Sequence, residues 1–346
     1  MCNMKKKTFN KKLYLVPAVT CLLIVIALTV YYFFTGLAIG SETKYVYIDD
    51  NDNLDSVVCK LSPLSSPHSL VALSMLLRHF GYDDEVRTGR YAINPGDGVV
   101  GVFRRLNNGQ QAPMMLTIPE SRTMRQLAGV LSRKLMIDSA TIACTLIDSS
   151  YCAKLGYTVE TIPALFVPNT YEVYWNVGID KLLERMKKEH DAFWTSERQQ
   201  QAQAIGLTPN EVCTLASIID EETANTAEKP MIAGMYLNRL SEGMPLQADP
   251  TVKFALGDFT IKRIRHGMLT TDSPYNTYKY EGLPPGPIKI ASIKGIDAVL
   301  HRVKHDFIYM CAKEDFSGTH NFAATYKEHL QNAARYAKAL NERGIE

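Results

Sequence analysis

Three consecutive carboxylates, Asp220, Glu221 and Glu222, follow an apolar run in the segment SIIDEET. Clustered acids are usually solvated, so the question is whether one of the three side chains has a different environment. A carboxyl group held against apolar neighbours has its charged form disfavoured and its pKa raised. Such a group can stay protonated near neutral pH and donate a proton to a leaving group, as the acid of a glycosidase does.

The residues before these acids predict an amphipathic helix. Thr208 can cap its N-terminus, Pro209 suits the first helical position, and Glu211 completes a capping box. At about 100° per residue, the apolar residues of this helix form one broad face. These residues are Val212, Leu215, Ala216, Ile218 and Ile219.

The same helical projection separates the three acids. Glu222 falls between Ile218 and Ile219, whereas Glu221 falls outside the apolar face and Asp220 on its rim. We therefore expect Glu222 alone to be directed at the core side. A structural Glu at a helix end, satisfied by a backbone group or an arginine, is the alternative interpretation.

Polar loops with rigid Pro/Gly turns follow this helix. They are LQADPT at 246–251, SPYNTY at 273–278 and GLPPGPI at 282–288. Amides, hydroxyls and aromatic rings suit a groove that holds a sugar chain. The candidate sugar-binding residues are Asn238, Gln247, Asp249, Tyr275, Asn276 and Tyr278.

With these motifs in order, the sequence resembles the YceG-like (MltG) family of endolytic peptidoglycan transglycosylases. The resemblance rests on SIIDEET, on NRL at 238–240 with Gly243-Met244, on LQADPTV, and on the loops at 273–278 and 282–288. It extends more loosely to GRY at 89–91, IPE at 118–120 and TYKEH at 325–329.

This resemblance implies a single-pass inner-membrane enzyme with a LysM-like subdomain before its catalytic domain. It implies cleavage within glycan strands to leave 1,6-anhydro-N-acetylmuramic acid ends, and penicillin-binding proteins as neighbours. The catalytic acid of the family falls on Glu222. The sequence departs from the family pattern at Asp220, at Glu221 where Lys is common, at Ala248 and at His329-Leu330. A negative Glu221 beside Glu222 is expected to raise the pKa of Glu222 further.

A single distinctive acid suggests an intramolecular reaction. The 6-hydroxyl of muramic acid would attack the anomeric carbon while Glu222 acts first as acid and then as base. Two other interpretations remain open. One is a hydrolase that uses water and a second carboxylate, perhaps Asp249. The other is a non-catalytic wall-binding or division scaffold in which Glu222 is structural.

The N-terminus predicts a membrane anchor. Lysines at 5–7 and 11–12 precede residues 13–40, which carry no charge and are long enough to cross a bilayer. The lysines orient the N-terminus toward the cytoplasm and the rest of the chain outside it. A cleaved signal peptide is the alternative, although its apolar region is usually about 7–15 residues long.

The fold class predicted for the 346 residues is α+β: an N-terminal transmembrane helix, a small LysM-like α/β subdomain and a mixed α+β catalytic domain. We expect a cytoplasmic tail at 1–12, an anchor at 13–40, the LysM-like subdomain at 41–118 and the catalytic domain at 119–346. Strands are predicted at 45–48, 89–93 and 114–118, and one exposed helix at 181–205.

The partners and cofactors follow from composition and spacing. A net charge of +2, with lysines concentrated at the N-terminus, lacks the basic stripe of a nucleic-acid-binding protein. No Cys or His spacing suggests a metal, so we expect no metal and no cofactor. The histidines of the last third, among them His320, are interpreted as surface or structural. The expected partners are peptidoglycan strands and the membrane.

Overall fold

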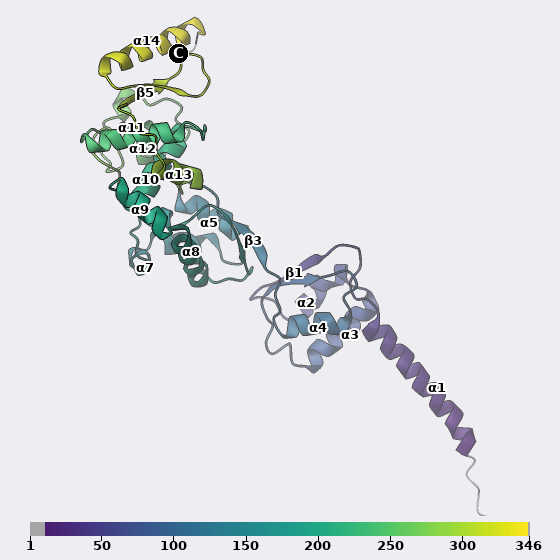
Figure 1. The fold of residues 1–346 in the computed structure, drawn as a ribbon. Coiled ribbons are helices and arrows are strands. Elements are labelled where there is room, and N and C mark those ends of the chain that lie inside the picture. The colour runs from purple at the N-terminus through teal and green to yellow at the C-terminus, as the bar shows by residue number, and fades with distance from the viewer. Residues whose placement is uncertain (1–10, 345–346) are drawn as a thin grey trace, which may run out of the picture. The chain divides into compact units, whose positions relative to one another are not determined.

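The computed structural model describes residues 11–344, and the chain divides into two compact units (Figure 1). The first unit holds the chain up to Met114 together with residues 172–176, and the second holds residues 115–171 and 177–346. Most of the expected cytoplasmic tail at 1–12 lies outside the described residues. The described residues combine many α-helices with three two-stranded sheets, so the predicted α+β class is confirmed.

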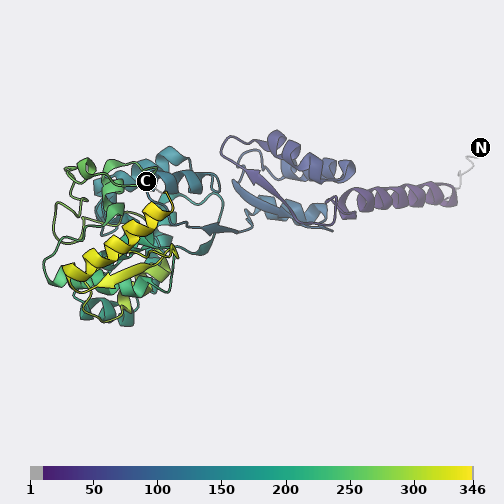
Figure 2. The ribbon, with the colours of Figure 1, turned by 90° about the horizontal axis from the view of Figure 1, so that it is seen from above.

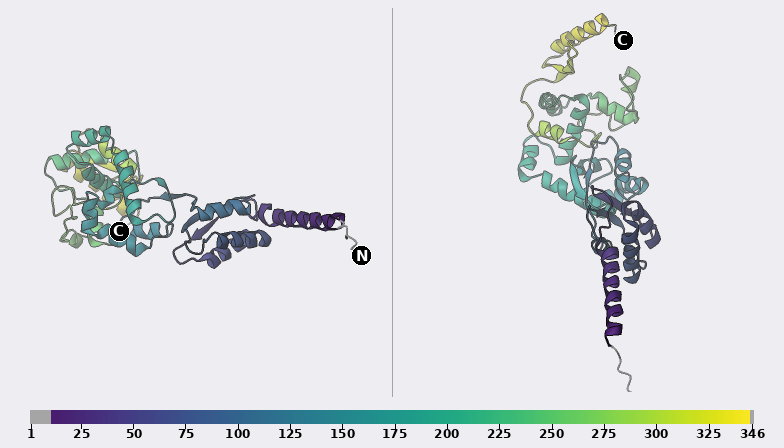
Figure 3. Two further views of the ribbon diagram at one scale, coloured as in Figure 1. Left: turned by 90° about the horizontal axis from the view of Figure 1, so that it is seen from below. Right: turned by 90° about the vertical axis from the view of Figure 1, so that its right-hand side faces the viewer.

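The N-terminal element is α1 (Lys11–Thr29), continued by a π-helical turn, η1 (Val30–Phe34). Residues Leu15–Phe34 are long and apolar enough to cross a membrane. Figures 2 and 3 show α1 leaving the first unit as a single helix. The helix ends before residue 40, because Leu37 is fully buried in the core of the first unit.

The first unit is built on a two-stranded antiparallel sheet of β1 (Lys44–Ile48) and β2 (Gly89–Ile93). Between the strands lie α2 (Leu54–Leu61), the 3-10 turn η2 (Ser62–Leu64) and α3 (Pro67–His79), and α4 (Val99–Asn107) follows β2. Alternate residues of both strands are buried, as the period of a strand requires. Both strands were predicted at these positions.

The second unit carries most of the helices. β3 (Met114–Thr117) pairs with β4 (Thr170–Val173), and the bounds of the two units fall within these strands. In the second unit, β5 (Tyr309–Ala312) pairs antiparallel with β6 (His320–Ala323). The C-terminal helix α14 (Tyr326–Glu342) lies over the β5–β6 hairpin (Figure 2). The helices of this unit are α5 (Met124–Ser132), α6 (Ser139–Ile147), α7 (Ser149–Lys154), α8 (Ile179–Phe193), α9 (Ser196–Ala204), α10 (Pro209–Glu222), α11 (Lys229–Ser241), α12 (Asp249–Leu256), α13 (Ile293–Leu300) and α14 (Tyr326–Glu342), with 3-10 turns η3 (Ile162–Leu165) and η4 (His266–Met268).

The single exposed helix predicted at 181–205 is wrong. The chain forms α8 and α9 instead, with a break at Trp194 and Thr195. Trp194 leaves the helical conformation and is buried, and Thr195 then caps α9 by accepting a hydrogen bond from the backbone of Arg198. The many charged residues of α8 suggested a fully exposed helix, but one side of it, which contains Leu182 and Met186, is buried.

The helix α10 begins with the predicted capping box of Thr208 and Glu211. It is not amphipathic, because every residue from Val212 to Ile219 is buried. Neighbouring helices cover it on several sides, and α13 approaches so closely that a Cβ on Gly295 would lie 2.5 Å from Oδ1 of Asp220. The environment of each carboxylate at the end of α10 is therefore set by the elements packed around it.

Candidate active site

The side chain of Asp220 is almost completely buried. Its side chain is 1% exposed and forms an ion pair with Lys229 of α11. It also accepts hydrogen bonds from the backbone N–H of Ser292 at 2.6 Å and from the hydroxyl of Ser292 at 2.8 Å. The prediction that Asp220 lies on the rim of the helix is therefore wrong, since α13 covers that side of α10. The charge of Asp220 is matched by Lys229.

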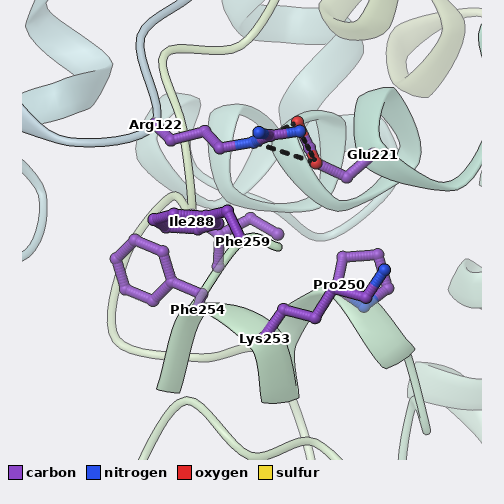
Figure 4. Close-up of a pocket in the computed structure, with 7 residues that line it drawn as sticks. All are labelled: Arg122, Glu221, Pro250, Lys253, Phe254, Phe259 and Ile288. Atoms are coloured by element: carbon purple, nitrogen blue, oxygen red, sulfur yellow. Dashed lines mark hydrogen bonds and ion pairs between the residues drawn. The ribbon is translucent and has the colours of Figure 1, made fainter. Parts of the chain in front are cut away.

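Glu221 is also paired with cations. Arg122 donates to its two carboxylate oxygens at 2.8 and 3.2 Å, and Lys289 lies 3.5 Å away. Figure 4 shows the Arg122 side chain reaching Glu221 beside a small pocket of about 40 Å³. The pocket is lined by Arg122, Glu221, Pro250, Lys253, Phe254, Phe259 and Ile288. Its volume leaves little room for a ligand.

Glu222 has a different environment from both neighbours. Its Oε1 accepts a hydrogen bond of 2.7 Å from the hydroxyl of Tyr236, a buried residue of α11. Within the described part of the chain, no Lys, Arg or His nitrogen lies within 4.0 Å of this carboxylate. Of the three acids, Glu222 is the one without a paired cation.

Burial raises the pKa of Glu222 to about 7. The hydrogen bond from Tyr236 acts in the opposite direction and lowers the pKa, and the negative charge of Asp249 raises it. The acid that adds to the shift is thus Asp249 and not Glu221. The charge of Glu221 is already neutralised by Arg122 and Lys289, which explains why its closeness in sequence has little effect.

Glu222 faces a polar cavity of about 210 Å³. The cavity is enclosed by the end of α10, one side of α11, the segment before α12, and the β5–β6 hairpin. Its lining residues are Glu222, Met235, Tyr236, Arg239, Leu246, Gln247, Asp249, Tyr278, Met310, Cys311, Ala312 and His320. The hydroxyl, amide, carboxyl and guanidinium groups suit a ligand rich in hydroxyls.

Three of the predicted sugar-binding residues, Gln247, Asp249 and Tyr278, line this cavity. The hydroxyl of Tyr278 donates to Oδ1 of Asp249 at 2.6 Å. Gln247 has a φ of 52°, a left-handed conformation that is uncommon for residues other than glycine. Its backbone N–H donates to the carbonyl of Thr277 at 3.0 Å, which joins the two polar loops.

The other three predicted residues lie outside the lining of the cavity. The Asn238 amide donates to the carbonyl of Phe307 at 3.0 Å, and the Asn276 amide donates to the carbonyl of Thr271 at 2.8 Å. Tyr275 packs against Phe254, with ring centroids 4.7 Å apart. These contacts hold the backbone that carries the cavity residues.

Tyr236, Arg239 and His320 also line the cavity, although none of them was predicted as a site residue. Tyr236 and Arg239 are three residues apart on α11, so the NRL motif was a guide to this helix face. His320 was interpreted as surface or structural, but it lines the cavity. Its backbone N–H and Nδ1 contact the carboxylate of Glu228 at 2.6 and 3.1 Å. No short spacing connects His320 with Glu222, because only the fold brings β6 to α10.

The fold and cavity define an α+β protein whose polar cleft presents a carboxylic acid, Glu222, with a pKa raised to about 7. A family model described as the YceG-like family matches residues 46–335, and the chain belongs to this family. A Bacillus subtilis (strain 168) protein named endolytic murein transglycosylase is 28% identical over 276 residues, covering 74% of this chain and 75% of that protein. A Streptococcus pneumoniae serotype 2 protein of the same name is 26% identical over 332 residues, covering 87% of this chain and 60% of that protein.

A solved structure has the same fold. The crystal structure of a yceG-like protein from Listeria monocytogenes matches with a TM-score of 0.55 at 25% identity. The match covers 84% of this chain and 99% of that chain. The similarity to this structure and to the two relatives therefore extends well beyond the region around Glu222.

Proposed function

We propose that the protein is a lytic transglycosylase that cleaves peptidoglycan within its glycan strands and leaves 1,6-anhydro-N-acetylmuramic acid ends. The observation that carries this proposal is the environment of Glu222. It is the one acid of its cluster without a cation, it faces a polar cavity, and burial raises its pKa to about 7. The relatives named endolytic murein transglycosylases support the choice of substrate and reaction.

In the proposed reaction, protonated Glu222 donates its proton to the glycosidic oxygen as the bond to the anomeric carbon breaks. The 6-hydroxyl of the same muramic acid forms the new bond to that carbon, and its proton passes to the Glu222 carboxylate. The acid is thereby restored, and no water is consumed. Because the nucleophile is already part of the sugar, the entropy cost of positioning it is small.

The remaining cavity groups are assigned to binding. Gln247, Asp249 and Tyr278 would contact sugar hydroxyls directly, since they line the cavity beside Glu222. Asn238 and Asn276, with Tyr275, would hold the surrounding backbone in place.

A test of the acid compares Glu222→Gln with Glu221→Gln on purified peptidoglycan. Both variants remove a carboxylate from the same helix end, but only Glu222 faces the cavity. We expect Glu222→Gln to retain the fold and lose nearly all product, and Glu221→Gln to retain most activity. Equal activity of the two variants would show that Glu222 is not the acid.

A two-carboxylate hydrolase is the second candidate, favoured by the position of Asp249 in the same cavity. Its nucleophile would be water, so its products would be heavier than anhydro products by the mass of one water molecule. Mass spectrometry of the muropeptide products distinguishes the two reactions. Binding of peptidoglycan without release of any fragment would instead support the non-catalytic scaffold.

We propose further roles for the rest of the chain. The strand–helix–helix–strand order of β1, α2, α3 and β2 supports a LysM-like module that holds glycan. The apolar helix Leu15–Phe34 supports a single-pass anchor in the cytoplasmic membrane, with the N-terminus inside. In that position the enzyme would terminate nascent strands beside penicillin-binding proteins. Crosslinking in cells, followed by mass spectrometry, tests this association.

A further inference from the structure

The C-terminal end of the apolar helix packs against α3. The ring of Tyr31 stacks on His68 in the first turn of α3, with centroids 4.2 Å apart. The hydroxyl of Thr35 also lies 2.8 Å from Nε2 of the same histidine. These contacts set the direction of α3 relative to α1 within the first unit.

From that point α3 runs back along the apolar helix. A cavity of about 310 Å³ separates the two helices, and its lining is almost entirely apolar. The lining residues are Val25, Leu28, Thr29, Tyr32, Phe33, Ala72 and Met75. Since Val25 and Leu28 precede Tyr31 in the chain, Ala72 and Met75 lie beside a part of the helix that is closer to its N-terminus.

The depth of α3 follows from the length of the helix. Residues Leu15–Phe34 form a helix of 20 residues. At about 1.5 Å per residue it is roughly 30 Å long, which equals the thickness of the hydrocarbon layer. Its final third therefore lies in the leaflet next to the first unit, and Met75 shares that depth.

The side chains of α3 at this depth are apolar and exposed. Met75 is 61% exposed and Val71 is 47% exposed, and the two are four residues apart on one face. In the last turn of α3, Arg78 forms an ion pair of 2.6 Å with Asp55. Because α3 runs toward the N-terminal part of α1, Arg78 lies deeper than Met75. Its ion pair with Asp55 and the reach of its long side chain toward the headgroups would reduce the cost of its charge there.

We propose that the face of α3 formed by Val71 and Met75 lies in the membrane beside α1, and that acyl chains of bilayer phospholipids fill the cavity between the two helices. The proposal rests on the proposed anchor and not on the catalytic reaction. The apolar cavity is continuous with the exposed side chains of α1, which lipid covers in a membrane. An apolar cavity is a poor site for water, since water needs polar partners.

The experiment uses the full chain in phospholipid nanodiscs. Met75→Trp is compared with Tyr47→Trp, in which the new indole lies on the outer face of β1. Emission of the parent chain, from Trp175 and Trp194, is subtracted. We expect the added emission of Met75→Trp to be blue-shifted and mostly lost when the lipid tails carry bromine. Tyr47→Trp should lose little.

Unquenched emission from Met75→Trp would overturn the proposal, as would equal quenching at both positions. Val71→Trp repeats the test on the same face, in case Met75→Trp does not fold. A chain that elutes apart from the nanodiscs would overturn the anchor and the proposal with it. Peptidoglycan cleavage by the same samples reports on the catalytic proposal separately.

Discussion

The pKa of Glu222 is balanced by two cavity residues that act in opposite directions. The hydroxyl of Tyr236 stabilises the charged carboxylate, and the negative charge of Asp249 destabilises it. If protonated Glu222 is the acid, kcat should fall as pH rises through its pKa of about 7. Tyr236→Phe should move this alkaline limb to higher pH, and Asp249→Asn should move it to lower pH.

The size of the Tyr236 effect follows from the hydrogen bond that is lost. A hydrogen bond to a charged group contributes about 1.5–3 kcal/mol. One pKa unit corresponds to about 1.36 kcal/mol, so Tyr236→Phe should raise the pKa of Glu222 by about 1–2 units. Tyr278→Phe is the matched control, because its hydroxyl is removed from the same cavity but bonds to Asp249 and not to Glu222. It should shift the limb far less.

The assay measures kcat for release of anhydro products from purified glycan strands at a series of pH values from mildly acidic to alkaline. Saturating substrate separates the ionisation of the bound enzyme from changes in KM. Shifts of the same sign in Tyr236→Phe and Asp249→Asn would refute the reasoning. An alkaline limb that stays in place in both variants would show that Glu222 does not carry the proton.

Three further predictions concern stability. Because the pKa of Glu222 is raised in the folded state, its stabilising contribution is complete below about pH 4.5 and is lost as pH rises through about 7. The free energy of unfolding of Glu222→Gln, measured in urea, should therefore exceed that of the parent by up to about 3 kcal/mol at pH 8. A difference between the two proteins that is the same at all pH values would contradict this. Gln247→Gly should have a free energy of unfolding about 1 kcal/mol higher than that of Gln247→Ala, since the left-handed backbone at φ 52° disfavours a Cβ. The reverse order of stability would exclude backbone strain at residue 247. Gly295→Ala should lower the free energy of unfolding by about 3–5 kcal/mol, because the new Cβ would break the buried ion pair of Asp220. Gly101→Ala is the control, since residue 101 has open space around it, and its free energy of unfolding should not fall in the same urea titration. A Gly295→Ala variant as stable as the parent would show that α13 can move away from α10.

The sequence by itself determined the local elements. It also pointed to Glu222 among the three acids, although the helical projection behind that choice was wrong about Asp220. Thr208 and Glu211 specify the start of α10 through their own hydrogen bonds, and Leu15–Phe34 is recognisable from composition alone. The alternating side chains of Tyr45–Ile48 likewise predicted a strand. Strand alternation and helix capping both depend on residues that are close together in the chain. The motif order also placed Gln247 in a loop close to the acid.

Only the tertiary structure decided how the three acids differ. The helical projection assumes one buried side, but α10 is enclosed, so the side chain of Asp220 is only 1% exposed. What distinguishes Glu222 is the lack of a cation, and the cations of its neighbours come from Arg122, Lys229 and Lys289 on other elements. The pKa of a side chain depends on its burial and on the charges close to it in space. Neither of these follows from how far apart two residues are in the sequence.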